Sequence, residues 1–119
     1  LEDPVYLEAL SKVHELTRKN GIDLLMNKHQ LDALIAPTNG PSWTIDLVNG
    51  DHFGGGSSEP AAISGYPNIS VPAGYVQGLP VGISFFGRAW SEATLIKLAF
   101  AYEQASKHRK APEFLKSIF

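Results

Sequence analysis

The sequence predicts an α/β fold, an α/β/α sandwich fragment with about three mixed strands and about four helices. Segments near both ends of the chain carry apolar residues at the three- and four-residue spacing of helices that pack on one face. Between these segments, short apolar runs are bounded by Pro and Gly, as strands commonly are. Two of the runs, ALIA and VGISFF, show little alternation of polar and apolar residues. Such strands are usually covered on both faces, but the first and last helices alone would cover about one face of a three-stranded sheet, so we expect something else to cover the other face.

The first helix is expected over residues 4–19. Asp3 followed by Pro4 is typical of a helix start, because the carboxylate accepts from free backbone N–H groups and Pro has no N–H to lose. The pair Asn20 and Gly21 predicts a left-handed helix stop. The chain also begins without Met and enters this helix directly, so we expect it to be a piece of a longer polypeptide.

A short second helix is expected from about Asp23 to near Gln30. It is followed by the apolar run LDALIAP, which has the length of a strand and ends at Pro37. The residues expected to point inward from the second helix are Ile22, Leu25 and Met26.

Residues 38–58 change in composition to Asn, Gly, Pro, Ser and Asp around a few apolar side chains, and long ordered loops of this kind are usually functional or packed over something. A short helix, PAAIS, should then close at Gly65. Two strands, NISVPAG and LPVGISFFG, should follow, with Gly82 and Gly87 marking close backbone approach or a bulge. Ser91 is expected to cap the last helix, with Glu92 in its first turn. Its inward stripe is predicted to be Leu95, Leu98, Ala99, Tyr102 and Ala105.

The stretch FGGGSSEP, residues 53–60, allows three interpretations: an anion cradle, a nucleophile loop or a helix cap. An anion cradle of the Walker type needs Gly-Lys-Ser/Thr, whereas here Glu59 follows the serines and repels anions. A nucleophilic Ser57 or Ser58 needs a base, and His52 is the nearest candidate in the sequence. The favoured interpretation is a cap, in which Ser58 accepts from the first free amides and Pro60 lies in the first turn.

The charge and composition of the chain exclude several classes of partner. The formal charge is -2, from 10 Lys and Arg against 12 Asp and Glu, and the basic cluster at residues 107–110 suits a helix C-terminus better than a nucleic-acid surface. There is no Cys and no apolar run of the ~18 residues that a membrane span needs. We therefore expect no nucleic-acid partner, no membrane partner and a cytoplasmic location.

The remaining chemistry-bearing residues have structural interpretations. The four His residues lack metal-site spacing such as H-E-x-x-H, so no metal is expected. Asp46 and Asp51 flank Asn49-Gly50. This pattern favours a turn over a pair of catalytic carboxylates. Trp43 either stacks on a ligand or is buried under the long loop.

The segments LDALIAPTNGPSW and GDHFGGGSSEPAAISGYPNISVPAGYVQGLPVGISFFGRAWSEATLIKLAFAYEQA resemble the C-terminal part of amidase signature enzymes. The resemblance covers nearly the whole chain, and the NGPSW and NGDHFGGGSS stretches are most similar to the peptide-amidase branch. It implies that residues 1–119 are a single C-terminal portion of one amidase signature domain, and hence one end of a large mixed sheet.

The resemblance implies amide hydrolysis without a cofactor. In the family, a serine attacks the carbonyl, a second serine in a cis peptide relays its proton to a lysine, and backbone amides hold the oxyanion. Those residues belong to an upstream half that this sequence lacks, so no catalytic residue is expected here and the chain alone should be inactive. The implied partners are a small-molecule or peptide amide substrate and the missing N-terminal portion of the same polypeptide.

By the same resemblance, this chain supplies a wall of the substrate channel. An acidic residue that contacts glutamine in the amidotransferase members falls near Gly55 here, and its absence favours another amide substrate. The positions that match the wall are Pro37, Thr38, Trp43, Gly55, Gly56, Ser57 and Ser58.

Two rival hypotheses remain open at this point. One is a self-standing binding or oligomerisation module, in which an uncovered sheet face meets a second copy of the chain. The other is a small serine hydrolase that uses Ser58 with His52.

Overall fold

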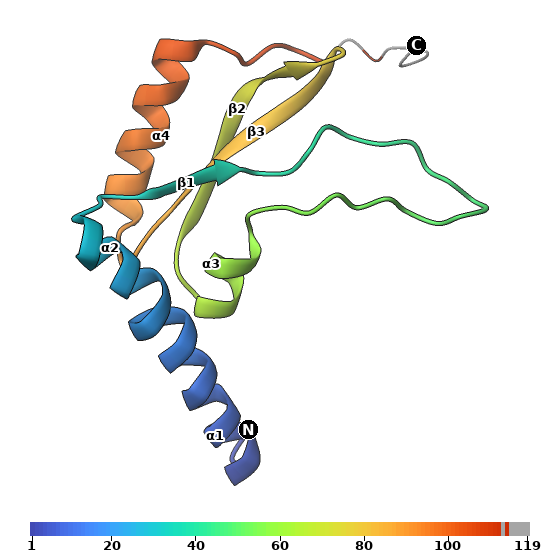
Figure 1. Cartoon of the computed structure of the whole chain (residues 1–119). Coiled ribbons are helices and arrows are strands. Elements are labelled where there is room, and N and C mark those ends of the chain that lie inside the picture. The colour runs from blue at the N-terminus through green and yellow to red at the C-terminus, as the bar shows by residue number, and fades with distance from the viewer. Residues whose placement is uncertain (113, 115–119) are drawn as a thin grey trace.

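The computed structural model describes residues 1–112 and 114, and it forms a three-stranded sheet with helices on both sides (Figure 1). Along the chain, an N-terminal helical segment is followed by one strand, a long loop, a short helix, two strands and a final helix. The bounds are α1 Pro4–His14, η1 Glu15–Ile22, α2 Asp23–His29, β1 Leu34–Pro37, α3 Glu59–Ser64, β2 Asn68–Val76, β3 Leu79–Phe86 and α4 Glu92–Ser106.

The sheet has the order β1-β3-β2, and both neighbours of β3 are antiparallel to it. Ser84 lies opposite Ala36 of β1 and Ser70 of β2. β2 and β3 are joined by a two-residue turn at Gln77 and Gly78, whose φ angles of 50° and 79° are both positive, as in the tight turns that suit twisted hairpins. A bulge interrupts the ladder between Pro72 and Gly74. All three predicted strands are therefore confirmed.

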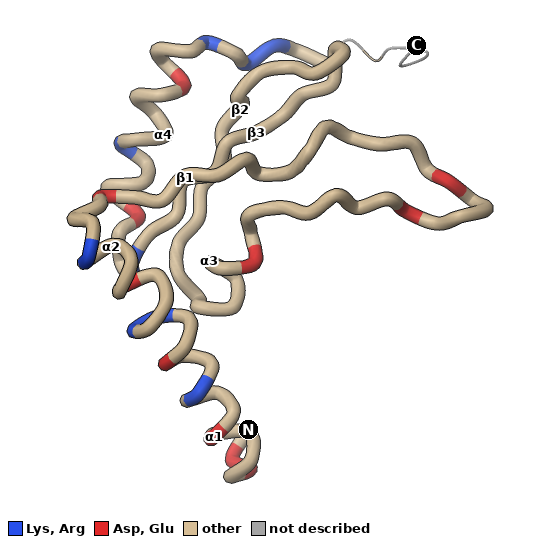
Figure 2. Tube along the Cα trace, viewed as in Figure 1, with Lys and Arg blue, Asp and Glu red and all other residues tan. Residues whose placement is uncertain are grey.

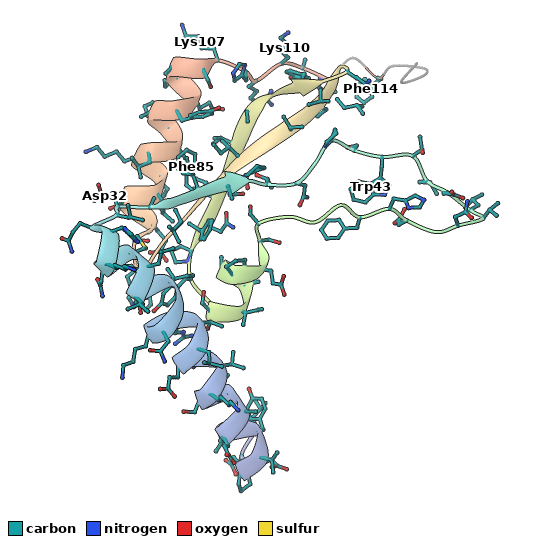
Figure 3. All side chains as sticks on the ribbon, viewed as in Figure 1. Asp32, Trp43, Phe85, Lys107, Lys110 and Phe114 are labelled. Atoms are coloured by element: carbon teal, nitrogen blue, oxygen red, sulfur yellow. The ribbon has the colours of Figure 1, made fainter. Side chains whose placement is uncertain are left out.

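The two faces of the sheet carry separate apolar clusters, because successive side chains of a strand point to opposite faces. On one face, Phe85 packs with Leu95 and Ala99 of α4, and Figure 3 shows Phe85 between the sheet and that helix. On the other face, Phe86 packs with Met26 of α2 and with residues of η1 and α3. Helices on both faces confirm the α/β/α prediction, and η1, α2 and α3 supply the cover for the second face.

The N-terminal helices follow one another in a kinked rod, which we call the N-terminal rod and which comprises α1, η1 and α2 (Figure 1). The kink lies at Gly21, whose φ of -113° and ψ of -107° are not helical, so the predicted interruption of the helix at Gly21 is confirmed. The predicted left-handed conformation of Gly21 is wrong, and the left-handed residue that ends the rod is Gln30, with φ 51°. Glycine also permits a close approach at the kink, because a Cβ on Gly21 would lie 2.9 Å from the carbonyl oxygen of Leu16.

Burial along the rod also differs from the expectation. Ile22 and Met26 are buried as predicted, but Leu25 is 44% exposed and points away from the cluster. α1 has no buried residue, and the described residues leave its apolar stripe, which includes Tyr6, Leu7 and Val13, largely uncovered. In α4, Leu95 and Ala99 are buried and Leu98 and Tyr102 pack beside them, as predicted, whereas Ala105 is exposed.

Helix ends follow the sequence signals in part. Asp3 caps α1 as predicted, since its Oδ1 accepts from the backbone N–H of Val5 at 2.8 Å. Ser58 and Ser91 precede α3 and α4, but neither side chain makes a capping hydrogen bond. Ser58 is already helical in φ and ψ, a conformation that differs from the extended one of a side-chain cap, and Ser91 Oγ donates instead to the carbonyl of Arg88.

The basic cluster at residues 107–110 lies just beyond α4 and not in its last turn, which contains no basic residue. Lys107 is the left-handed residue that closes the helix. Lys110 folds back so that its Nζ lies 5.2 Å from the ring centre of Tyr75 in β2.

Candidate functional site

A cleft of about 590 Å³ lies between α3 and the sheet, on the face opposite α4. Its floor is formed by side chains at the end of β1 and in β2 and β3, and its wall by the first and second turns of α3. All of its lining side chains are uncharged, and they include Thr38, Ser58, Ala61, Asn68, Ser70 and Ser84.

Three hydroxyl groups, one from each strand region, meet on the floor of this cleft, and we call Thr38, Ser70 and Ser84 the hydroxyl cluster. Ser84 Oγ lies 2.8 Å from both Thr38 Oγ1 and Ser70 Oγ, and Thr38 Oγ1 lies 3.2 Å from Ser70 Oγ. Strand register brings these residues together, because Ser70 and Ser84 are direct cross-strand partners. Ser84 is 1% exposed, so its hydroxyl depends on the other two for hydrogen bonds.

The absence of a side chain on Gly82 leaves room for Thr38 in the hydroxyl cluster. A Cβ on Gly82 would lie 2.9 Å from Thr38 Oγ1, and the N–H of Thr38 donates to the carbonyl of Gly82 at 2.8 Å. The predicted close approach at Gly82 is thus confirmed, while the bulge lies in the partner strand β2. Gly87 is similarly close to its neighbours, since a Cβ there would lie 2.9 Å from Ser91 Oγ.

The α3 wall is fixed to the N-terminal rod at its C-terminal end. Arg18 Nε donates to the carbonyl of Ser64 at 2.6 Å, and its guanidinium lies 5.6 Å from the ring centre of Tyr66. The Tyr66 hydroxyl donates to Asp23 Oδ2 at 2.8 Å. Burial raises the pKa of the Tyr66 hydroxyl, and the hydrogen bond to Asp23 raises this pKa further. Tyr66 therefore stays a neutral donor that ties the wall to the rod.

Residues 39–56 form a long arm that extends away from the sheet (Figure 1). The two ends of the arm are held together by a bridge between Asn39 and Gly56, and by the N–H of Ser57, which donates to the carbonyl of Thr38 at 3.0 Å. A Cβ on Gly56 would lie 2.9 Å from that same carbonyl oxygen. The base of the arm is therefore anchored directly beside the hydroxyl cluster.

In the middle of the arm, the aromatic rings of Trp43 and Phe53 are in contact, and their centres are 5.8 Å apart. Figure 3 shows Trp43 within the arm, away from the sheet. Trp43 Nε1 donates to Asp51 Oδ1 at 3.2 Å. Trp43 is 41% exposed, so burial under the loop is wrong, and stacking on a ligand stays a prediction.

The tip of the arm is a turn organised by Asp46, as the sequence predicts. The N–H groups of Val48 and Asn49 both donate to Asp46 Oδ1 at 2.9 Å, and Asn49 Nδ2 donates to Asp46 Oδ2 at 2.9 Å. The backbone N–H of Asn49 is the main cause that holds the pKa of the Asp46 carboxyl below its ordinary value of 3.8, followed by the Asn49 side chain and the Val48 N–H.

Acidification is expected to open this turn. A carboxyl with a lowered pKa stabilises the folded turn above its ordinary value of 3.8, and the stabilisation is lost as the pH falls through the lower folded pKa. Amide-proton NMR shifts of Val48 and Asn49 should titrate together with a midpoint below 3.8. In Asp46→Asn, which keeps the Oδ1 acceptor, this titration should vanish. A midpoint above 3.8 in the unmodified chain would contradict the assignment.

The structure gathers some of the predicted wall residues and separates others. Thr38 and Ser58 line the cleft. Gly56 and Ser57 lie at the base of the arm, Gly55 lies within the arm with φ +95°, and Trp43 lies further out. Pro37 lines a different, apolar hollow of about 440 Å³ together with Ile35, Val81 and Ile83.

Sequence reasoning missed Ser70 and Ser84, which complete the hydroxyl cluster. The signal for them is a single serine inside each of the apolar strands NISVP and GISFF. The two serines can be related to each other only when the pairing register of the two strands is known.

The geometry does not bring Ser58 and His52 together. His52 Nε2 lies 3.8 Å from Asp46 Oδ2 at the arm tip, whereas Ser58 lines the cleft beside the arm base. Among residues 1–112 and 114, no three His, Cys, Asp or Glu side chains are grouped to hold a metal ion. Within the same residues, no helix has the length and hydropathy needed to cross a bilayer.

Comparison with known protein families gives a match over most of the chain. The family model described as Amidase matches residues 2–96. A probable amidase of Arabidopsis thaliana is 44% identical over 108 residues, which cover 90% of this chain and 18% of that protein. A glutamyl-tRNA(Gln) amidotransferase subunit of Moorella thermoacetica is 38% identical over 118 residues, covering 93% of this chain and 23% of the relative.

Solved structures give the same result. The native peptide amidase of Stenotrophomonas maltophilia superposes with a TM-score of 0.83 at 46% identity, over 96% of this chain and 23% of that one. A peptide amidase in complex with the competitive inhibitor chymostatin gives a TM-score of 0.89 at 49% identity, over 96% and 23%. This chain thus spans about a fifth of the length of the proteins it matches.

Proposed function

The chain belongs to the amidase family, and from that membership we propose that it is the C-terminal portion of a larger hydrolase that cleaves linear amide bonds. Two observations support this proposal. The sequence matches about a fifth of its relatives' length, and the described residues leave the apolar stripe of α1 largely uncovered. An amphipathic helix with an uncovered face normally packs against another element, and the remainder of the polypeptide is the element we assign to it.

We assign the bond-breaking residues to the rest of the polypeptide. The family chemistry requires two serines and a lysine, and the resemblance locates all three upstream of this sequence. Among the residues that the structure describes, Ser58 has no histidine base beside it, since His52 contacts Asp46 instead. A serine hydroxyl without an adjacent base is a weak nucleophile. The chain alone is therefore expected to be inactive.

The part assigned to this chain is a wall of the substrate channel, at the cleft between α3 and the sheet. The single observation that carries this assignment is the uncharged, hydroxyl-lined cleft, which contains the predicted positions Thr38 and Ser58. The arm begins at the edge of this cleft, so its movement would change access to the site. The arm bounds one side of the proposed channel.

A peptide-type amide is the substrate class we propose. The identity of 46% with the Stenotrophomonas maltophilia peptide amidase supports it, as does the size of the cleft. Gly55 supports it too, because the resemblance implies an acidic side chain near this position in enzymes that use glutamine.

A chimera tests the proposal. We expect a chimera in which this chain replaces the matching segment of the Stenotrophomonas maltophilia peptide amidase to release ammonia from a dipeptide amide. Its rate should exceed that of the isolated chain at least about a hundredfold, because only the chimera contains an activated nucleophile. Ammonia release is measured with a coupled enzymatic assay.

The control is the peptide amidase from which the matching segment has been deleted, which should be inactive. Hydrolysis by the isolated chain that disappears in Ser57→Ala or Ser58→Ala would overturn the assignment. A folded chimera that hydrolyses no amide would overturn it as well.

A further inference from the structure

We propose that Thr38 and Ser70 form a subsite that binds a backbone amide of a peptide substrate, next to the amide that is cleaved. This inference rests on the proposed function and deepens it, because it names the group that separates a peptide amide from a simple carboxamide.

Thr38 and Ser70 lie where two hollows of the surface meet. A second hollow of about 320 Å³ adjoins the cleft, and Thr38 and Ser70 line both. The hydroxyl cluster therefore lies at the junction of an elongated groove and not at a closed end. A substrate that extends through such a groove must pass over these two hydroxyls.

The hydroxyls of Thr38 and Ser70 have hydrogen-bond capacity left for a ligand. Each hydroxyl can donate one hydrogen bond and accept two, and its hydrogen can rotate to suit a partner. Ser84 is buried and uses its hydrogen bonds on Thr38 and Ser70, which themselves border the groove. The contact between Thr38 and Ser70 is the longest of the three, at 3.2 Å against 2.8 Å. It is the one that a ligand can replace at least cost.

The chemistry of an amide matches this capacity. A trans peptide amide carries an N–H donor and a carbonyl acceptor that point in opposite directions, so two hydroxyls 3.2 Å apart cannot contact both groups of one amide. Thr38 can turn its hydrogen from Ser70 toward a ligand carbonyl, while Ser70 donates to Ser84 and Ser84 donates to Thr38. The hydroxyl cluster can thus bind the carbonyl of a substrate amide.

Electrostatics disfavours charged ligands at the same place. Both hollows are lined by uncharged residues only, so neither a carboxylate nor an ammonium group finds a counter-charge there. The sequence has no Lys or Arg between Lys28 and Arg88, and Figure 2 shows only acidic positions along the arm and α3. Arg18 is engaged with Ser64 at the far end of α3 and does not line the groove. A neutral polar group is the ligand that remains.

The test compares two substrates in the chimera described above. In Ser70→Ala and in Thr38→Val, the KM for a dipeptide amide should rise about fivefold relative to the KM for propionamide, which lacks a second amide. The ratio of the two KM values is the readout, because general damage to the fold would affect both substrates. Ser70→Thr retains a hydroxyl and should restore the original ratio.

Ser11→Ala, on the exposed face of α1, is the matched control for loss of a serine hydroxyl, and its KM ratio should equal that of the unmodified chimera. An unchanged ratio in both Ser70→Ala and Thr38→Val would overturn the subsite while leaving the proposed function intact. A chimera that hydrolyses neither amide would instead overturn the proposed function, and the subsite with it.

Discussion

Leu95→Ala is expected to lower the free energy of unfolding by about 3 kcal/mol, because it leaves a cavity in the apolar cluster under α4. Leu95 is 1% exposed and packs in one cluster with Phe85 and Ala99. Urea denaturation of the purified chain, followed by far-UV circular dichroism, measures the loss.

Ile96→Ala is the matched control, since it removes an aliphatic side chain from the next position of the same helix. Ile96 is 57% exposed, and its replacement should change the free energy of unfolding by less than about 0.5 kcal/mol. Equal losses in the two variants would contradict the packing of α4 described above.

Met26→Ala is expected to cost about 3 kcal/mol of stability, through the cluster on the opposite face of the sheet. Met26 is 1% exposed and belongs to the same cluster as Ile22, Ala61 and Phe86. It therefore links the N-terminal rod, α3 and the sheet at one point. Because Ala61 also lines the cleft, the loss should loosen the wall as well as the core. The measurement is again urea denaturation.

Leu25→Ala is the matched control for Met26→Ala. The sequence predicts that Leu25 points inward beside Met26, but the structure leaves Leu25 44% exposed. Leu25→Ala should therefore cost well under half of what Met26→Ala costs. If the two losses were equal, or if Leu25→Ala were the more damaging, the rotation of α2 in the structure would be wrong.

Local signals were sufficient for most elements of the fold. Pro37 and the apolar run before it mark the end of β1, and Asp3 with Pro4 marks the start of α1, because turn and cap chemistry depends on neighbours in sequence. The interruption predicted at Gly21 is present as a kink, but the left-handed conformation predicted there is wrong. A glycine that adopts a left-handed conformation and one that relieves a contact, as Gly21 does with Leu16, look identical in sequence.

The site was less predictable than the fold. The family resemblance predicts Thr38 and Ser58 as wall positions; both line the cleft, and their role in a substrate channel stays a prediction. Ser70 and Ser84 are 14 residues apart and meet only through strand pairing, so no local pattern relates them. Ser58 precedes α3 as expected, but its side chain does not cap the helix, because its backbone is already helical.

The register of the β2–β3 hairpin has a consequence for how this chain can change in length. Moving β3 by one residue against β2 would turn Phe85 toward the cleft and Ser84 into the apolar cluster beneath α4. Insertions or deletions among the paired residues should therefore be tolerated in twos, or singly only where a bulge like the one between Pro72 and Gly74 absorbs the change. Any other odd change would exchange the face that carries the hydroxyl cluster with the face that packs under α4.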